Sequence, residues 1–173
     1  MPILHNQPEN INFLSPLGFK FTLQRAPNLN FFVTDVNIPS ITLGFIEMPT
    51  PFKIIELPGD KLDFGDLQVT FRVDEDFANY FEIYNWLRAL GFPDEFGQYK
   101  KIRDSNPGTK DTIYSDATLT IMNSAMIPNI EVRFQDLFPV TISDINFTAT
   151  DSTVNYVTNT ASFKFKKFDV IKL

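Results

Sequence analysis

The chain has 173 residues, of which 43% are hydrophobic, and a formal net charge of −6 at pH 7. This length is enough for one domain with a proper core and too short for two domains of ordinary size. The negative charge argues against a protein that binds duplex DNA, because such proteins neutralise phosphates with clustered Lys and Arg.

Residues 1–14 show little periodicity and are expected to form an extended arm. The start of the chain lacks the basic and apolar blocks of a secretory signal, and no apolar run approaches the ~20 residues that span a bilayer. We therefore expect a soluble protein made in a cytoplasm. The first strand follows the arm, with apolar residues from Leu17 to Leu23 alternating with polar ones, and residues 25–28 are expected to form a turn.

Two further strands are predicted at Asn30–Ile38 and Ile41–Glu47, separated by Pro39 and Ser40. The prolines of residues 48–51 indicate the tip of a hairpin, from which Phe52–Leu57 returns as a short apolar strand. Such a hairpin, with few charged residues, would be an adhesive surface if exposed.

Residues Pro58-Gly59-Asp60 have the composition of a turn, and we expect the chain to re-enter the sheet after them. Apolar residues alternate strictly from Leu67 to Val73, which predicts a strand. The acidic residues 74–76 are expected to cap the one clear helix, at about 74–90, which Gly91 ends. Its predicted buried face is Phe77, Tyr80, Phe81, Tyr84, Leu87 and Leu90, with Trp86 at the border.

Residues 92–112 are polar and contain several Gly and Pro, so this stretch is predicted to be a long loop. The remaining strands are predicted at Ser115–Asn123, Ile130–Phe134, Thr141–Thr148 and Thr153–Ile171, the last bent or split near Asn159. The predicted fold is mainly β: an antiparallel β-sandwich or small barrel with one α-helix, in a single domain spanning 15–173.

No catalytic group stands out. Cysteine is absent, which excludes thiol nucleophiles and Cys-ligated metals, and the only histidine, His5, lies in the arm, where it is poorly placed for a catalytic triad. Nucleotide-binding glycine loops and HExxH are absent. The carboxylates near residue 60 do not have the spacing of an EF-hand. The interleaved Phe and Lys of 163–168 fit an amphipathic strand better than a surface for single-stranded nucleic acid. We expect no enzyme, cofactor or metal.

Several segments, in their order along the chain, resemble the tail tube subunits of contractile-tailed bacteriophages. In that family a basic-apolar strand leads into a Gly-Asp corner, an acidic-aromatic turn and an alternating strand before the helix. The same order is found here in Lys53–Asp60, Phe64-Gly65-Asp66 and Leu67–Phe71. Leu137–Val140, Ile142–Ile145 and the strand near Ser162–Phe165 resemble the family's closing strands more loosely.

The resemblance implies a tube-like β-sandwich that assembles as a sixfold ring. The inner strands of such a ring join edge to edge into a barrel of about two dozen strands, wide enough for a DNA duplex. The rings would stack axially as a conduit for DNA, without sequence-specific binding. Partners would be further copies of the chain and sheath, baseplate or terminator proteins, in a virion tail assembled in the host cytoplasm, with no membrane involved. A tube initiator or terminator would share the fold.

The resemblance also implies two sets of site residues. The hairpin of about 45–57 would bury its apolar side against a neighbouring subunit, and the wall of the lumen would be poor in Lys and Arg, because a conduit must not hold its cargo. The candidates for the subunit interface are Phe45, Met48, Phe52, Ile54, Ile55 and Leu57. The candidates for the lumen are Asp144, Asn146, Thr148, Asp151 and Thr153.

Two other functions compete with this interpretation. A monomeric β-sandwich could bind a ligand such as a carbohydrate through exposed aromatic side chains, and an enzyme could work with carboxylates alone. Assembly into rings or tubes separates the first interpretation from both.

Overall fold

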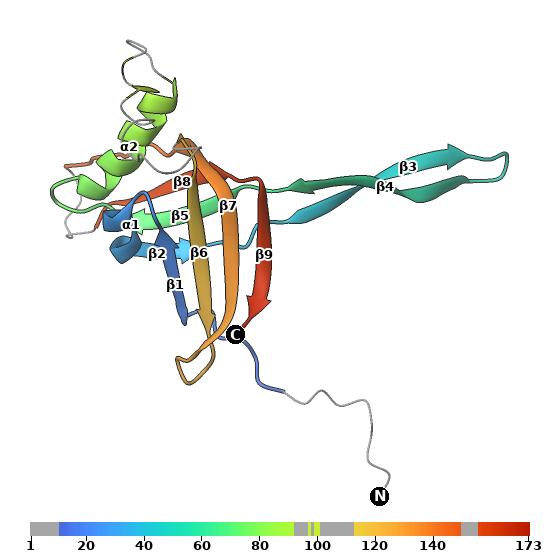
Figure 1. Cartoon of the computed structure of the whole chain (residues 1–173), viewed down its shortest axis with the longest axis horizontal. Coiled ribbons are helices and arrows are strands. Elements are labelled where there is room, and N and C mark those ends of the chain that lie inside the picture. Colours follow the sequence, from blue (N-terminus) through green and yellow to red (C-terminus); the bar gives the residue numbers. More distant parts are fainter. Residues whose placement is uncertain (1–10, 92–96, 98, 101–112, 150–155) are drawn as a thin grey trace, which may run out of the picture.

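The computed structural model describes residues 11–91, 97, 99–100, 113–149 and 156–173 (Figure 1). His5, Asp151, Thr153 and most of the predicted arm and of the predicted loop at 92–112 lie outside these residues. In the part that is described, every pair of neighbouring strands is antiparallel. None of the described helices is long and apolar enough to cross a membrane.

One sheet of the body consists of β1 (Phe19–Leu23), β6 (Ser115–Met122), the first part of β7 (Pro128–Ile142) and β9 (Lys167–Lys172). Their order is β1-β6-β7-β9, and they run roughly side by side in Figure 1. Each strand alternates apolar and polar residues, so this sheet has an apolar face turned to the core and a polar face turned outward.

A second sheet crosses the first and contains β2 (Val33–Val36), β5 (Leu67–Arg72), β8 (Thr158–Lys164) and the last part of β7. The long strand β7 therefore belongs to both sheets. It changes partner near Asp136, which has a positive φ of 53° and a backbone N–H that donates to the Asp116 carboxylate at 3.2 Å. Aspartate tolerates this conformation better than most residues, so it suits the bend.

The core lies between the two sheets and is closed at one side by the helices α1 (Pro27–Phe32) and α2 (Ala78–Gly91). Its largest fully buried side chains are Phe71, Phe134 and Phe163, one on each of three strands. Trp86 of α2 packs near Phe163, with ring centroids 6.3 Å apart. The predicted mainly-β fold with an antiparallel sandwich is confirmed.

The helix at about 74–90 is confirmed, but its predicted cap is wrong, and its predicted buried face is right only in part, since Leu87 and Leu90 pack against the core. Helix α2 begins at Ala78, after the acidic residues, and its buried residues are Asn79, Ile83, Trp86 and Ala89. Phe81 and Tyr84, which were expected inside, are 50% and 38% exposed. Two faces of this helix have residues at helical spacing. The buried face includes the polar Asn79, so its apolar pattern is weaker in the sequence than that of the exposed face.

Polar contacts explain why that face goes inside. Asn79 Nδ2 donates to the Arg72 carbonyl at 2.7 Å, and Trp86 Nε1 donates to the Ile113 carbonyl at 3.1 Å. Both side chains can therefore be buried without losing hydrogen bonds.

The structure contains a second helix that the sequence did not predict. Residues 27–32, expected to be a turn and the start of a strand, form α1 with Pro27 in its first turn, where the fixed φ of proline is favourable. Glu82 of α2 accepts hydrogen bonds from the backbone N–H groups of Asn28 and Leu29, at 3.4 and 3.2 Å, which satisfies the free N–H groups at the start of α1. The predicted strand is thereby shortened to β2.

The hairpin is longer than predicted. It consists of β3 (Ile41–Pro49) and β4 (Ile54–Phe64), with its tip at the predicted place, and it projects far from the body (Figure 1). Residues 58–60, predicted to be a turn, lie inside β4, and the chain turns back only after Phe64. The reason is a bulge, at which residues 59–61 of β4 lie opposite Gly44 alone.

Three smaller predictions also change. The predicted strands at 130–134 and 141–148 are one strand, β7, which ends at Ile142, and residues 143–148 are irregular. The long last strand is split at residues 165–166 rather than near Asn159. Within the predicted loop at 92–112, the described residues Gly97, Tyr99 and Lys100 are helical.

Replacing Phe163 by alanine should destabilise the body strongly, because this side chain is fully buried between the sheets. Deleting a buried phenylalanine typically costs about 3–5 kcal/mol. Urea unfolding followed by Trp86 fluorescence measures the loss. Phe52→Ala is the matched control, since Phe52 is 97% exposed and its removal should leave the free energy of unfolding unchanged within about 0.5 kcal/mol.

Candidate assembly interface

The hairpin exposes many large apolar side chains. No residue of β3 or β4 belongs to the buried core, although much of the hairpin is hydrophobic. Monomeric proteins rarely expose contiguous apolar surface on this scale. The exposed large side chains are Ile41, Leu43, Phe45, Ile46, Met48, Phe52, Ile54, Leu57 and Leu62.

The six residues predicted for the subunit interface all lie on this hairpin, but they do not form one surface. Directly opposite residues of an antiparallel pair share a face, and Met48 lies opposite Ile55 while Leu57 lies opposite Ile46. Phe45 and Ile54 belong to the other face, and Phe52 is at the tip. Ile41, Leu43 and Leu62 were missed, because the turn was expected at residues 58–60 and not after Phe64.

Two glycines meet in the middle of the hairpin. A Cβ atom added to Gly59 would lie 2.6 Å from the carbonyl oxygen of Gly44, closer than real contacts allow. A Cβ added to Gly44 would meet only the Lys61 carbonyl, at 3.7 Å, which is an ordinary distance. Only position 59 therefore requires glycine, and it fixes the bulge at which the hairpin strands approach each other.

The first sheet of the body has two free edges. Strand β1 pairs only with β6, and β9 pairs only with β7, so the outer N–H and C=O groups of both strands have no strand partner in the described chain. Free edges of this kind pair readily with another strand. Because neighbouring strands alternate in direction across the sheet, β1 and β9 run antiparallel to each other.

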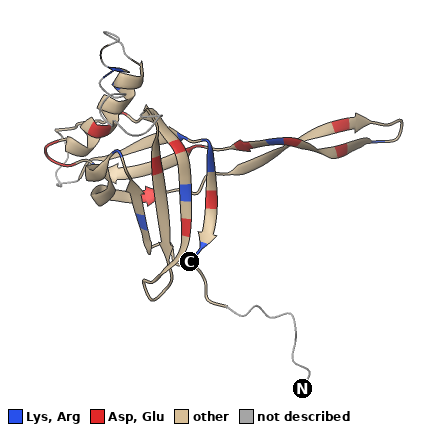
Figure 2. Ribbon diagram, in the orientation of Figure 1, with Lys and Arg blue, Asp and Glu red and all other residues tan. Residues whose placement is uncertain are grey.

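The outward face of this sheet is polar and carries alternating charges, which Figure 2 shows most clearly along β7 and β9. Its basic residues are Lys20, Arg133 and Lys167, and its acidic residues are Asp116, Glu131 and Asp169. The face also carries Thr22, Thr118, Thr120, Met122, Gln135 and Ile171. This polar face was not predicted from the sequence, although the alternation of polar and apolar residues within 115–122 indicates it.

Most of these charges are neutralised within a strand. Arg133 donates from Nε and Nη2 to the two carboxylate oxygens of Glu131, at 3.0 and 2.9 Å, and this hydrogen bonding holds the pKa of Glu131 below its usual range. Lys167 and Asp169 form a second pair, at 3.2 Å. The face therefore presents little net charge to whatever lies in front of it.

The residues predicted for the lumen lie elsewhere. Asp144, Asn146 and Thr148 follow the end of β7 in irregular chain, and Phe147 beside them contacts Phe77 near α2, with ring centroids 6.5 Å apart. Their placement in a lumen stays a prediction, as does that of Asp151 and Thr153. Among the described residues, no three His, Cys, Asp or Glu side chains are grouped so that they could hold a metal ion.

Comparisons with known proteins give a match in structure only. No family model matches the chain, and no curated protein sequence does. The chain is similar to the tube-terminating cap of the anti-feeding prophage, with a TM-score of 0.62, 12% identity and 100% of both chains covered. It is also similar to a chain of the PVC sheath–tube complex of an extracellular contractile injection system, with a TM-score of 0.58, 12% identity and 92% of both chains covered.

A third match, to a chain of the PVC sheath/tube terminator, has a TM-score of 0.57 and 12% identity and covers 94% of this chain and 99% of the other. The chain thus has the tube fold found in contractile injection systems.

Replacing Gly59 by alanine should open the hairpin while leaving the body folded. The added Cβ would force the strands apart at Gly44, and overpacking of this kind costs about 1–3 kcal/mol. Hydrogen exchange measures the effect, as faster exchange of the amides in β3 and β4 with unchanged protection of β5–β7. Gly44→Ala is the matched control, and equal effects of the two substitutions would contradict the proposed close contact.

Proposed function

We propose that this protein is a structural subunit of the tube of a contractile injection particle, assembled as stacked sixfold rings around a conduit. The observation that carries the proposal is the first sheet of the body: four antiparallel strands with two free edges, an apolar face covered by the rest of the domain, and a polar face left open. A sheet of this kind is complete only when its edges are paired. The tube fold supports the same arrangement.

In the proposed ring, β9 of one copy pairs with β1 of the next. The two strands have similar lengths, six and five residues, and run antiparallel within a chain, so the new pair continues the alternation of directions around the ring. Four strands from each of six copies give a closed barrel of about two dozen strands, in which no edge of this sheet remains free. Because each contact joins two different edges, the interface is heterologous and closes as a ring.

The polar face of the sheet would form the wall of the conduit. The second sheet and both helices cover the other face, and these bulky layers fit only on the outside of a ring. Asp144, Asn146 and Thr148 lie near α2 rather than on this face, so we propose the polar face as the main wall in their place. Its paired charges would bind a passing polyanion such as DNA only weakly, because neither sign dominates.

The partners of such a subunit would be further copies of the chain together with sheath, baseplate or terminator proteins, in a phage-like tail assembled in the host cytoplasm. The matched structures are those of a tube-terminating cap and of a sheath–tube complex. Both a subunit of the tube shaft and a terminator of the tube fit the geometry. A monomeric carbohydrate-binding module is a poorer fit, because it leaves the exposed apolar hairpin without a role.

Electron microscopy of the purified full-length chain at increasing concentration tests the proposal. We expect rings, or tubes of stacked rings, with a concentration dependence that follows from mass action. Sedimentation should show a ring species in equilibrium with monomer. A chain that stays monomeric at all concentrations and salt conditions would contradict the proposal.

The proposed junction can be tested by disulfide cross-linking, because the chain has no cysteine of its own. Thr22→Cys on β1 is combined in turn with Lys167→Cys, Asp169→Cys or Ile171→Cys on β9. Two strands lie between β1 and β9 of one chain, which separates them by about 14 Å, too far for a disulfide within a chain. We expect one of these pairs to give a ladder of covalent oligomers up to six on a non-reducing gel.

Thr22→Cys combined with Asp35→Cys is the control for this experiment. Asp35 is exposed on β2, at the free edge of the second sheet, which the proposed junction does not use. This pair should give no ladder. Equal ladders from the control pair and the best β1–β9 pair would show random collision and would contradict the junction.

A further inference from the structure

The free edge of β1 has a defined set of unpaired backbone groups. The Gly18 carbonyl accepts a hydrogen bond from the Met122 N–H at 2.8 Å, and the Gln24 N–H donates to the same neighbouring segment at 3.3 Å. Backbone groups alternate in direction along a strand. The even-numbered residues of β1 therefore bond to β6, and Phe19 and Phe21 direct their N–H and C=O groups outward.

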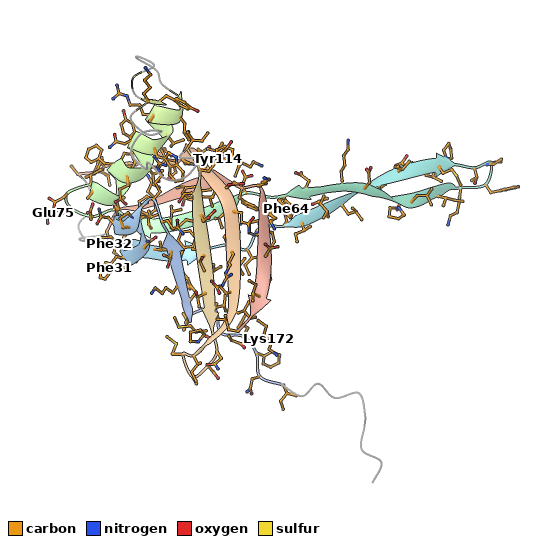
Figure 3. All side chains as sticks on the ribbon, viewed as in Figure 1. Phe31, Phe32, Phe64, Glu75, Tyr114 and Lys172 are labelled. Carbon is orange, nitrogen blue, oxygen red and sulfur yellow. The ribbon has the colours of Figure 1, made fainter. Side chains whose placement is uncertain are left out.

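The free edge of β9 has the matching pattern. The Leu173 N–H donates to the Asn129 carbonyl at 2.9 Å, so the odd-numbered residues of β9 bond to β7. The groups directed outward are those of Phe168, Val170 and Lys172, and Figure 3 labels Lys172 near the end of this strand. Pairing of the two edges in the proposed ring therefore brings these residues opposite Phe19 and Phe21.

Closure of the ring limits how β9 of one copy can be aligned with β1 of the next. One row of directly opposite residues crosses the sheet through Thr22, Thr118, Arg133 and Asp169. A flush junction would place Asp169 opposite the next copy's Thr22, but a closed barrel requires staggered strands. A shift by one residue would turn polar side chains to the apolar side. The smallest shift that remains is two residues.

The charges on the polar face distinguish the possible shifts. A shift of two residues places Lys20 opposite Asp169 in one direction and opposite Leu173 in the other. A shift of four in the first direction would place Lys20 opposite Lys167. Opposite charges stabilise a directly opposed pair, whereas like charges destabilise it. Among the described residues no carboxylate forms an ion pair with Lys20, so this ammonium group is available to a neighbour.

The apolar side of the sheet favours the same alignment. Val170 lies directly opposite the fully buried Val132, so its side chain points to the core side of the sheet. Val170 is nevertheless 60% exposed, because the described chain has no strand beyond this edge. With Lys20 opposite Asp169, the half-buried Phe19 of the next copy lies opposite Val170 and covers it.

The backbone pattern also suits an ion pair at this place. Phe19 and Val170 would exchange backbone hydrogen bonds, and so would Phe21 and Phe168. Lys20 and Asp169 lie between these two pairs as a non-hydrogen-bonded pair. Side chains come closest in such pairs, where the Cα atoms are about 4.5 Å apart.

We propose that Lys20 of one copy forms an ion pair with Asp169 of the next, and that this pair, with the contact between Phe19 and Val170, sets the alignment in which the ring closes. The proposal rests on the ring assembly proposed above and adds its register. Asp169 then lies between two ammonium groups, that of Lys167 on its own strand at 3.2 Å and that of the neighbour. Lys20 and Asp169 are positioning residues, repeated at every junction.

Charge reversal tests the pair. Lys20→Glu and Asp169→Lys each place like charges across every junction. We expect each to raise the concentration at which half of the copies are in rings by about fivefold or more. Mass photometry measures this concentration. Thr118→Glu is the control, because it changes the charge of the same face away from both edges, and it should shift the value by less than about twofold.

Mixing the two variants distinguishes a contact between copies from a change within one chain. In a ring in which Lys20→Glu copies alternate with Asp169→Lys copies, every junction joins opposite charges. We therefore expect an equimolar mixture to assemble within about twofold of the concentration that the unmodified chain needs. A defect in folding would not be corrected by mixing. The proposed pair is overturned if the single variants assemble normally or if the mixture assembles no better than they do.

The cross-linking experiment on β1 and β9 checks the alignment separately. The proposed register places Thr22 opposite Lys167, so the Thr22→Cys/Lys167→Cys pair should give the strongest ladder. A stronger ladder with Asp169→Cys would indicate the flush alignment, and one with Ile171→Cys the opposite shift. Either result would overturn the register while leaving the ring in place. If the unmodified chain forms no rings at all, the tube function fails, and the register fails with it.

Discussion

The structure depends on the requirement that the backbone N–H and C=O groups at the edges of a β-sheet find partners. Within the described chain, the first sheet of the body ends in β1 on one side and β9 on the other, and neither has a second neighbour. A monomer can tolerate such edges only by exposing them to water, where they attract other strands. A closed barrel made from several copies satisfies both edges at once, and it does so without any residue specialised for chemistry.

The same requirement explains how the body is divided. Strand β7 bends at Asp136 and serves both sheets, so the chain builds a sheet that is polar on one side and a second layer that covers the other side. Buried side chains such as Phe134 and Phe163 hold the layers together. The polar side needs no cover from the protein, and its acid–base pairs along β7 and β9 neutralise each other locally. One face of this sheet is thus covered by the core, and the other is left polar and open.

The sequence predicted those parts of the fold in which local pattern and final environment agree. Strand β5 alternates strictly and has one buried face, so its prediction was correct, and the tip of the hairpin was found from its prolines. The errors occur where distant contacts override the local pattern. Residues 58–60 look like a turn, yet pairing with Gly44 keeps them in β4 as a bulge. The buried face of α2 depends on hydrogen bonds from Asn79 and Trp86 to distant carbonyls, which no local pattern contains.

The site was predictable in place but not in detail, for a physical reason. The apolar character of the hairpin follows from its composition, whereas the faces of its residues follow from the register of β3 against β4, which a bulge can shift. The comparisons point the same way: the fold is shared at only 12% identity over the whole chain. A fold can be shared at such low identity because the alternation of polar and apolar residues, rather than the individual side chains, determines which face of a strand is buried. In the proposed ring, the edge of β9 and the edge of β1 need only stay complementary to each other, so individual side chains there can change together.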